Sequence, residues 1–459
     1  MPLSRRRFLQ QTALASFIFP ALVRGQNLNS KLQLVQIGCG GKGGDDIQQI
    51  GSHAKVRYVG FCDVDKNRFG AANATNPGVA HFSDYREMFE KLGSQFDAAV
   101  ISTPDHMHAL PALRAMRLRK HVYLQKPLAH SIAETRALQV EAKQNGVRTQ
   151  MGIQIHSNSE YRTAVSLIRS GRIGKIKAIH SWQANQGNQW TQRTSLPDPA
   201  TAPANLDWDL WLGGAAERPY ANGVYHPANW RDWKDFGGGT LGDFGCHILD
   251  PVFTAIGLTA PISVIAENSG VNPQTWSASQ TVHYVFPGTS FTTEATLPVT
   301  WYDGGRQPDP ALAKMPAGMN LPREGSLFVG EEGTVILPHV GNPMIFPVEK
   351  FGVTLSPGDA TRRKRKLAAG EKDERKVAEI EVVEARNHYH DWVDAALGGP
   401  ETTANFAYAG PLTEAVLIGT IATQVPGSKL VWDQATMRIT NNEQAQALVS
   451  KPYRKGWTV

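Results

Sequence analysis

Short apolar runs alternate with longer amphipathic segments over residues 32–153 of the chain. The apolar runs predict five strands, at 32–37, 56–62, 98–101, 121–124 and 149–153. Since the segments between them have the periodicity of helices, the pattern predicts βαβ units around a parallel sheet. We therefore expect residues 27–152 to form an α/β domain.

The pattern changes after about residue 152, where Trp, Pro and Gly become more frequent and loops lengthen. Alternating runs predict strands of a second, open and largely antiparallel sheet, at 281–286, 291–297 and 326–329. Helices are predicted at 387–396 and 411–425, and loops at 304–322 and 357–372. Residues 153–459 are therefore expected to form an α+β domain.

The chain has 459 residues, with 47 Lys and Arg against 41 Asp and Glu, and a formal net charge of +6. Arg5, Arg6, Arg7 and Arg24 lie in an acid-free N-terminal stretch, so the remainder is close to neutral. This balance does not favour a nucleic-acid partner. The basic run at 362–366 is followed closely by acidic residues, and we interpret it as a solvated loop.

Residues 1–26 have the pattern of an export signal. The motif Ser4-Arg5-Arg6-Arg7-Phe8-Leu9-Gln10 precedes an apolar stretch that is too short and too often interrupted to cross a membrane. The segment resembles a twin-arginine signal, with Gln10 where lysine is more usual. The resemblance implies export of the folded protein by the twin-arginine machinery, to the periplasm or beyond the cell. No integral membrane segment is expected once the signal is removed.

Three cysteines, Cys39, Cys62 and Cys246, show neither the spacing of a metal site nor that of a disulfide framework. We therefore expect no metal. Each cysteine is interpreted as a small buried apolar residue.

A glycine-rich loop follows the first predicted strand and opens a predicted helix. It reads Gly38-Cys39-Gly40-Gly41-Lys42-Gly43 and matches the pattern G-x-G-x-x-G. In such a loop the first glycine allows a tight turn, the second lets the backbone approach a pyrophosphate, and the third lets helix pack on strand. Asp63 ends the next strand, where a carboxylate binds a ribose diol and repels a 2′-phosphate. The segment therefore predicts a Rossmann dinucleotide-binding domain that favours NAD over NADP.

Three further segments carry a family resemblance. Residues 102–108 follow the strand ending at Ile101, the tripeptide Gln125-Lys126-Pro127 follows the strand ending at Leu124, and residues 237–250 begin with three glycines. Together with the glycine loop, these motifs resemble the family of glucose-fructose oxidoreductase, inositol dehydrogenase and MocA (Gfo/Idh/MocA). The ending of the chain, from Leu430-Val431-Trp432-Asp433 to Tyr453-Arg454-Lys455-Gly456-Trp457, resembles the large secreted bacterial branch of that family. The resemblance implies a C-terminal substrate-binding and oligomerisation domain, and a homo-oligomer.

The resemblance also implies catalytic roles. It places Lys126 between the nicotinamide ribose and a substrate hydroxyl, with a cis peptide bond before Pro127. The usual tripeptide is Glu-Lys-Pro, so Gln125 cannot pair ionically with Lys126, and we interpret this departure as a tuning difference. Asp243 and His247 lie four residues apart, on one face of a predicted helix. We expect His247 to be the general base, and Asp243 to bind a substrate hydroxyl or to orient its neighbours.

The remaining candidates are residues that we expect to contact the cofactor or the substrate. Cofactor contacts are predicted at Gly38, Gly40, Gly41, Lys42, Gly43, Asp63, Thr103, Pro104, His108, Gln125 and Lys126. Substrate contacts are predicted at His156, Tyr225, His226, Arg231, Asp243 and His247. Six tryptophans among polar residues suit a sugar ring or pack a loop-rich subdomain: Trp182, Trp190, Trp208, Trp211, Trp230 and Trp233.

We therefore expect an NAD-dependent oxidoreductase acting on a hydroxyl or keto group of a sugar, polyol or glycoside. Two alternatives stay open. One is an NAD-dependent glycoside hydrolase that oxidises its substrate transiently, and the other is a non-catalytic sugar-sensing module. Because free NAD is scarce outside the cytoplasm, export predicts a tightly retained cofactor.

Overall fold

The computed structural model describes residues 31–184, 195–355 and 357–458 and contains two sheets. The first is a six-stranded parallel sheet of order β3-β2-β1-β4-β5-β6. Its strands are β1 Leu32–Ile37, β2 Val56–Cys62, β3 Ala80–Phe82, β4 Ala98–Ile101, β5 His121–Gln125 and β6 Thr149–Gly152. Its helices are α2 Lys42–Gly51, α3 Gly70–Thr75, α4 Tyr85–Leu92, α5 Ala109–Arg117 and α6 Ile132–Asn145. The five predicted strands are confirmed, and the short strand β3 was not predicted.

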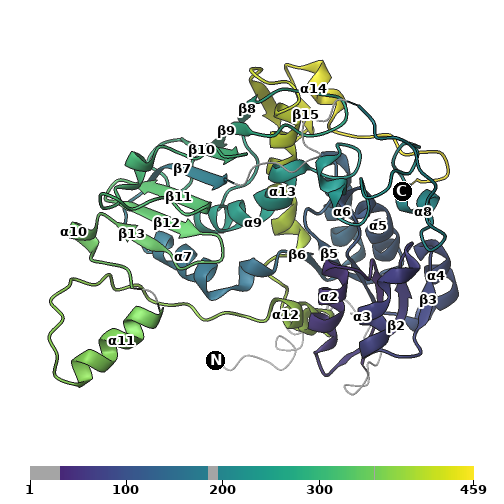
Figure 1. Ribbon diagram of the computed structural model, residues 1–459, viewed down its shortest axis with the longest axis horizontal. Helices are drawn as coiled ribbons and strands as arrows, with labels where there is room; N and C mark the ends of the chain where they lie inside the picture. The colour runs from purple at the N-terminus through teal and green to yellow at the C-terminus, as the bar shows by residue number, and fades with distance from the viewer. Residues whose placement is uncertain (1–30, 185–194, 356, 459) are drawn as a thin grey trace, which may run out of the picture.

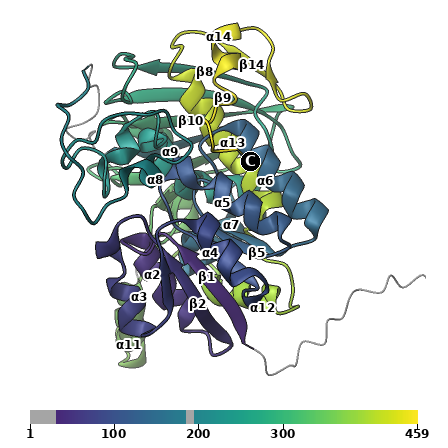
Figure 2. The same ribbon diagram turned by 90° about the vertical axis from the view of Figure 1, so that its right-hand side faces the viewer.

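The second sheet has nine strands in the order β13-β12-β11-β7-β10-β9-β8-β14-β15, and only the β7–β10 pair is parallel. Its strands are β7 Ile176–Gln183, β8 Ser263–Asn268, β9 Gln280–Pro287, β10 Thr296–Asp303, β11 Glu324–Gly330, β12 Thr334–Pro338, β13 Met344–Phe346, β14 Leu430–Asp433 and β15 Arg438–Ile439. The α-helices of this part are α7 Ser159–Arg169, α8 Trp208–Leu212, α9 Gly239–Ile256, α10 Val348–Phe351, α11 Pro357–Ala368, α12 His388–Ala396, α13 Phe406–Ala422 and α14 Glu443–Ala447. Helices α9 and α13 lie between the two sheets (Figures 1 and 2). The expected pairing of a Rossmann sheet with an open, largely antiparallel sheet is confirmed.

Local sequence sets the helix ends. The Ser131 hydroxyl accepts a hydrogen bond from the backbone N–H of Glu134 and donates one to the Glu134 carboxylate, so Ser131 caps the start of α6. The helix ends at Gly146, whose φ of 62° is in the left-handed region. Helix α13 begins five residues earlier than predicted because the Asn405 side chain accepts hydrogen bonds from two backbone N–H groups of its first turn.

Two predicted elements are wrong. Residues 291–295 form a turn rather than a strand, because the hydroxyls of Thr289 and Thr292 bond nearby backbone groups in place of a ladder. The basic segment predicted as a loop contains α11, since Arg, Lys, Leu and Ala are good helix formers and Pro357 occupies the first position. Figure 1 shows α11 standing away from both sheets.

One helix from the later part of the chain completes the core of the parallel sheet. Tyr389, Trp392 and Val393 of α12 pack with Ile47 of α2 and Tyr123 of β5. This contact brings residues near 390 beside the glycine loop. The three cysteines are buried and unpaired. Among the described residues, the helices are too short or too polar to span a membrane.

Candidate functional site

A cavity of about 410 Å³ opens at the carboxyl ends of the parallel strands. The strand order reverses between β1 and β4, which is where open α/β sheets bind ligands. Twelve predicted site residues line this cavity: Gly38, Gly40, Gly41, Lys42, Asp63, Thr103, Pro104, His108, Gln125, Lys126, His226 and Arg231.

The glycine loop has the geometry of a phosphate cradle. Gly38 has a φ of 81°, and a Cβ added there would lie 2.5 Å from the Ser102 carbonyl oxygen. A Cβ on Gly43 would lie 2.1 Å from the Gly38 carbonyl oxygen, so the helix packs against the strand only without a side chain. A Cβ on Gly41 would enter open space. Beside Gly40 lies the flexible Arg68 side chain, with its Cδ 2.5 Å from such a Cβ.

Asp63 is fixed in the cavity wall at the end of β2. Its carboxylate accepts backbone hydrogen bonds from Cys39 at 2.8 Å and from Asp65 at 2.9 Å. Burial raises the pKa of Asp63, against the effect of these two bonds. The position and the carboxylate fit an adenine-ribose diol.

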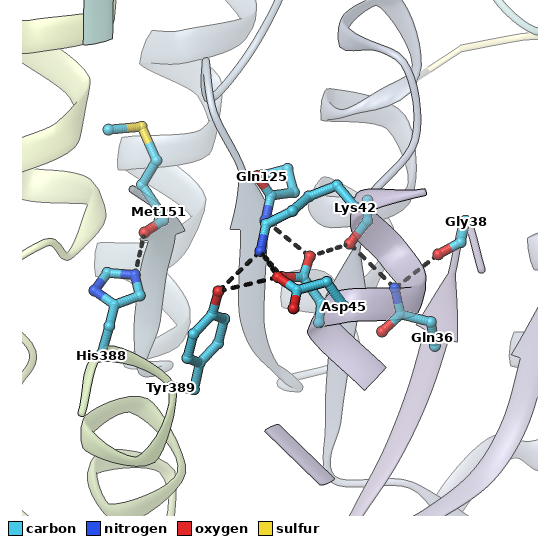
Figure 3. Close-up of polar contacts among 10 residues, drawn as sticks. Gln36, Gly38, Lys42, Asp45, Gln125, Met151, His388 and Tyr389 are labelled. Carbon is cyan, nitrogen blue, oxygen red and sulfur yellow. Dashed lines mark hydrogen bonds and ion pairs between the residues drawn. The ribbon is translucent and has the colours of Figure 1, made fainter. Parts of the chain in front are cut away.

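Lys42 lies at the centre of a partly buried network (Figure 3). Its Nζ donates to the Tyr389 hydroxyl at 2.8 Å, lies 3.0 Å from Asp46 Oδ1, and also pairs with Asp45. Burial acts to lower the pKa of Lys42, but the charge of Asp46 and the hydrogen bonds to Asp45 and Tyr389 together outweigh it and hold that pKa above its usual value. Lys42 therefore stays charged and connects the glycine loop to α12.

The same network accounts for Gln125. Its Nε2 donates to Asp46 Oδ2 at 2.8 Å, and the Ser102 hydroxyl donates to the same oxygen at 2.7 Å. Asp46 is completely buried, so a glutamate at position 125 would place a second carboxylate against it. Gln125 thus supplies the donor that this site requires, and Gly152 leaves room for its amide.

Lys126 and Asp243 meet across the cavity wall. Lys126 Nζ donates to the Asp243 backbone oxygen at 2.7 Å and pairs with the Asp243 carboxylate. Arg231 Nε lies 3.2 Å from the same carboxylate. Burial acts to raise the pKa of Asp243, but the charges of Lys126 and Arg231 outweigh it and hold that pKa well below its usual range. The expected cis peptide bond before Pro127 is present.

His247 lies one helical turn after Asp243 on α9. Its Nδ1 is buried and has no hydrogen-bond partner within the described ranges, and its ring lies 5.7 Å from that of His339. Burial, assisted by the charge of Lys126, lowers the pKa of His247 well below its usual value. The imidazole is therefore neutral, as a proton acceptor must be. His247 and Asp243 do not themselves line the cavity, but Asp243 contacts Lys126 and Arg231, which do.

Sequence reasoning missed Asp105, which lines the cavity beside Lys126. Its side chain is buried, and burial raises the pKa of Asp105 to about 7, against the opposing charges of Lys126 and Arg231. The only signal was its place in the motif at 102–108, since an aspartate after a strand also occurs as a plain turn residue.

Two of the predicted histidines, His108 and His156, are held by contacts with other residues of the protein. His108 braces two loops, with Nδ1 2.7 Å from the Pro127 oxygen and Nε2 2.8 Å from the Thr103 oxygen. His156 lies outside the cavity, where its nitrogens contact Asp250 at 2.8 Å and Thr403 at 2.9 Å. Its substrate contact therefore stays a prediction.

Some of the predicted aromatic residues line the cavity and others lie elsewhere. Tyr225 is buried in an aromatic cluster with Trp208 and Trp233 and does not line the cavity, and its substrate contact stays a prediction. His226 lines the cavity and contacts Asp65 at 2.8 Å. Of the six tryptophans, Trp211 and Trp230 line the cavity, Trp182 packs in the second sheet, and Trp190 lies outside the described residues.

Two family models match consecutive parts of the chain. Residues 32–153 match the oxidoreductase family with an NAD-binding Rossmann fold, and residues 166–290 match the C-terminal alpha/beta domain of the same Gfo/Idh/MocA family. Inositol 2-dehydrogenase 2 of Saccharopolyspora erythraea is 30% identical over 204 residues, covering 42% of this chain and 58% of that protein. The match thus spans little more than half the length of this curated relative.

Solved structures share the fold at low identity. The WlbA dehydrogenase from Bordetella pertussis, in complex with NADH and UDP-GlcNAcA, has a TM-score of 0.59 and 16% identity over 88% of this chain and 99% of its own. Aldose-aldose oxidoreductase from Caulobacter crescentus, complexed with glycerol, has a TM-score of 0.56 and 15% identity over 87% of this chain and 99% of its own.

Proposed function

This chain belongs to the Gfo/Idh/MocA oxidoreductase family, and on that premise we propose that it is an NAD(P)-dependent oxidoreductase of a sugar, polyol or glycoside. One observation carries the proposal. A glycine cradle and Asp63 share a single cavity with Lys126, which an ion pair joins to Asp243. The relatives' names, and Trp211 and Trp230 in the cavity wall, support a hydroxyl-rich substrate.

The residues present fit a dinucleotide. The glycine loop leaves space at Gly41 for an anion at the start of α2, and Asp63 offers a carboxylate to a ribose diol. Because that carboxylate repels a 2′-phosphate, NAD is favoured over NADP. When bound, nicotinamide supplies a hydride acceptor or donor.

Side chains of this protein accept the hydroxyl proton that the substrate releases. As an alcohol is oxidised, its C–H hydrogen leaves as hydride and its O–H proton must pass to a base. His247 is the proposed acceptor of that proton, because burial keeps its ring neutral and it lies one helical turn after Asp243, whose carboxylate pairs with Lys126 at the cavity wall. Lys126, held by Asp243, positions its ammonium to stabilise negative charge developing on the oxygen.

The test is made on the purified protein. Denaturation followed by mass spectrometry identifies any bound dinucleotide, and the intact protein is assayed on a panel of sugars, polyols and aryl glycosides. The proposal predicts NAD and net oxidation or reduction of a panel member. A protein that neither contains nor binds NAD(P) contradicts it.

The same panel separates the alternatives. Release of an aglycone without net NADH selects a glycoside hydrolase with a retained cofactor. Binding of a sugar without any turnover selects a sensing module. The ion pair of Lys126 with Asp243 beside a neutral His247 favours catalysis over sensing.

Location and assembly form part of the same proposal. The twin-arginine pattern, which lies outside the described residues, supports export to the periplasm or the medium. The open second sheet supports a homo-oligomer. Fractionation of cells with and without an Arg5→Lys, Arg6→Lys change, and light scattering of the purified protein, test these two points.

A further inference from the structure

Residues 451–458, far along the chain from the glycine loop, return to the Rossmann domain and place Trp457 in the wall of the cavity. Trp457 is 6% exposed. The Arg86 guanidinium lies over its ring at 4.1 Å from the centroid, and the Tyr85 ring lies 6.5 Å away. The indole is thus packed against the start of α4 while it also faces the cavity.

Specific contacts hold this segment in place. Arg454 donates from its backbone N–H to the Gly214 oxygen at 3.0 Å and from its side chain to the Gly213 oxygen at 3.1 Å. Tyr453 donates from its hydroxyl to Glu134 of α6 at 2.5 Å. Residues 451–458 are therefore held between the end of α8 and the start of α4 (Figure 1). Its contacts come from helices far apart in sequence, so its path is set by the folded protein.

The strand order fixes where along the cavity Trp457 lies. The cavity wall includes Tyr85 after β3, Asp63 after β2, and Lys126 after β5. In the sheet, β3 and β5 are separated by four strand spacings, or about 19 Å. Because Trp457 packs on Tyr85 and Arg86, it lies beyond Asp63 and at the opposite end from Lys126. Asp63 marks the adenine-ribose side of the cavity, so Trp457 lies on the adenosine side.

We propose that Trp457 forms part of the adenosine-binding end of the dinucleotide site. An indole offers a broad aromatic surface to a purine, and such contacts are tolerant of exact orientation. The Arg86 guanidinium, which is paired with Asp84, packs on the ring and fixes the position of the indole. The inference rests on the proposed function, since it assigns a residue to the same cofactor site.

Two fragments of the cofactor test the assignment. ADP-ribose contains the adenosine end, whereas nicotinamide mononucleotide lacks it. We expect Trp457→Leu, which keeps a buried apolar side chain, to raise the Kd of ADP-ribose and of NAD about 5- to 100-fold. The Kd of nicotinamide mononucleotide should not change. Isothermal titration calorimetry on the full chain measures all three.

Two variants serve as controls. Trp457→Phe keeps an aromatic ring and should retain most of the affinity for ADP-ribose. Trp432, which is 5% exposed in β14 and lies outside the cavity, is the matched site, and Trp432→Leu should leave ADP-ribose binding unchanged. Circular dichroism and the melting temperature establish that each variant is folded.

The outcomes are distinct. Wild-type affinity of Trp457→Leu for ADP-ribose, or an equal loss for nicotinamide mononucleotide, overturns the assignment and leaves the oxidoreductase proposal intact. A wild-type protein that binds neither ADP-ribose nor NAD overturns both. Selective loss of the adenosine-containing ligands, restored by phenylalanine, supports the assignment.

Discussion

The two ends of the cavity are built in different ways. The phosphate cradle comes from one short segment, residues 38–43, in which missing side chains decide the geometry. The charged end joins Lys126 to Asp243, 117 residues later, and Asp243 in turn to Arg231. The first end depends on local sterics, and the second on a balance of buried charges that only the assembled fold creates. Substitutions should therefore separate cofactor binding from proton transfer.

The largest effect is expected at the charged end. His247→Ala removes the neutral imidazole and should lower turnover about 10²- to 10⁴-fold, because that is the usual contribution of a general base. The affinity for NAD should stay at the wild-type value, since His247 does not line the cavity. Steady-state kinetics and calorimetry measure the two quantities.

His180→Ala is the matched control, because His180 bonds Tyr302 in the second sheet, outside the cavity. It should keep wild-type turnover. Full activity in His247→Ala would remove that residue from the mechanism.

The next effect concerns the buried Asp105 and depends on pH. Its pKa of about 7 in the folded protein lies above the value of about 3.9 expected for an unfolded aspartate. The folded state therefore binds a proton that the unfolded chain releases, and this carboxyl reduces stability as pH rises from 4 to 7.

Asp105→Asn removes that pH dependence. Relative to wild type, the variant should gain stability between pH 4 and pH 8, by up to about 4 kcal/mol. Melting temperatures across this range measure the difference. A difference that does not change with pH would contradict the buried, protonated state of Asp105.

At the cradle, Gly43→Ala should weaken NAD binding and cost about 1–3 kcal/mol of stability, because the new Cβ overlaps the Gly38 oxygen. Gly70→Ala is the control, since a Cβ there meets no atom within 4 Å. Calorimetry and thermal melting compare the two variants. Equal NAD affinity in Gly43→Ala and Gly70→Ala would show that the cradle does not bind the cofactor.

The last effect is on stability alone and concerns Gln125, which bonds Asp46 of α2 and directly precedes Lys126. Gln125→Glu places a carboxylate against the buried Asp46, and should cost about 1–3 kcal/mol because it replaces a donor by an unpaired acceptor. The double variant Gln125→Glu, Asp46→Asn restores a donor and should recover most of that loss. Denaturant titration measures both variants. Without recovery, the explanation of Gln125 by Asp46 fails.

Local patterns predicted the parallel sheet and the glycine loop because both are set within a few residues. Twelve predicted residues do meet in one cavity. His156 and Tyr225 were placed near the substrate from sequence proximity, but the fold pairs one with Asp250 and buries the other among aromatics. Asp105 and Trp457 could not be found in this way, because their significance depends on burial and on contacts with distant segments.

Transfer of an isotopic label tests the central claim that Lys126 and His247 act beside a bound nicotinamide. The protein is incubated with sugars and polyols deuterated at each carbinol carbon, and its dinucleotide is then analysed by mass spectrometry. The account predicts deuterium on the nicotinamide ring with a reactive compound, and its loss in His247→Ala. Product formed from such a compound while the dinucleotide stays unlabelled would contradict it.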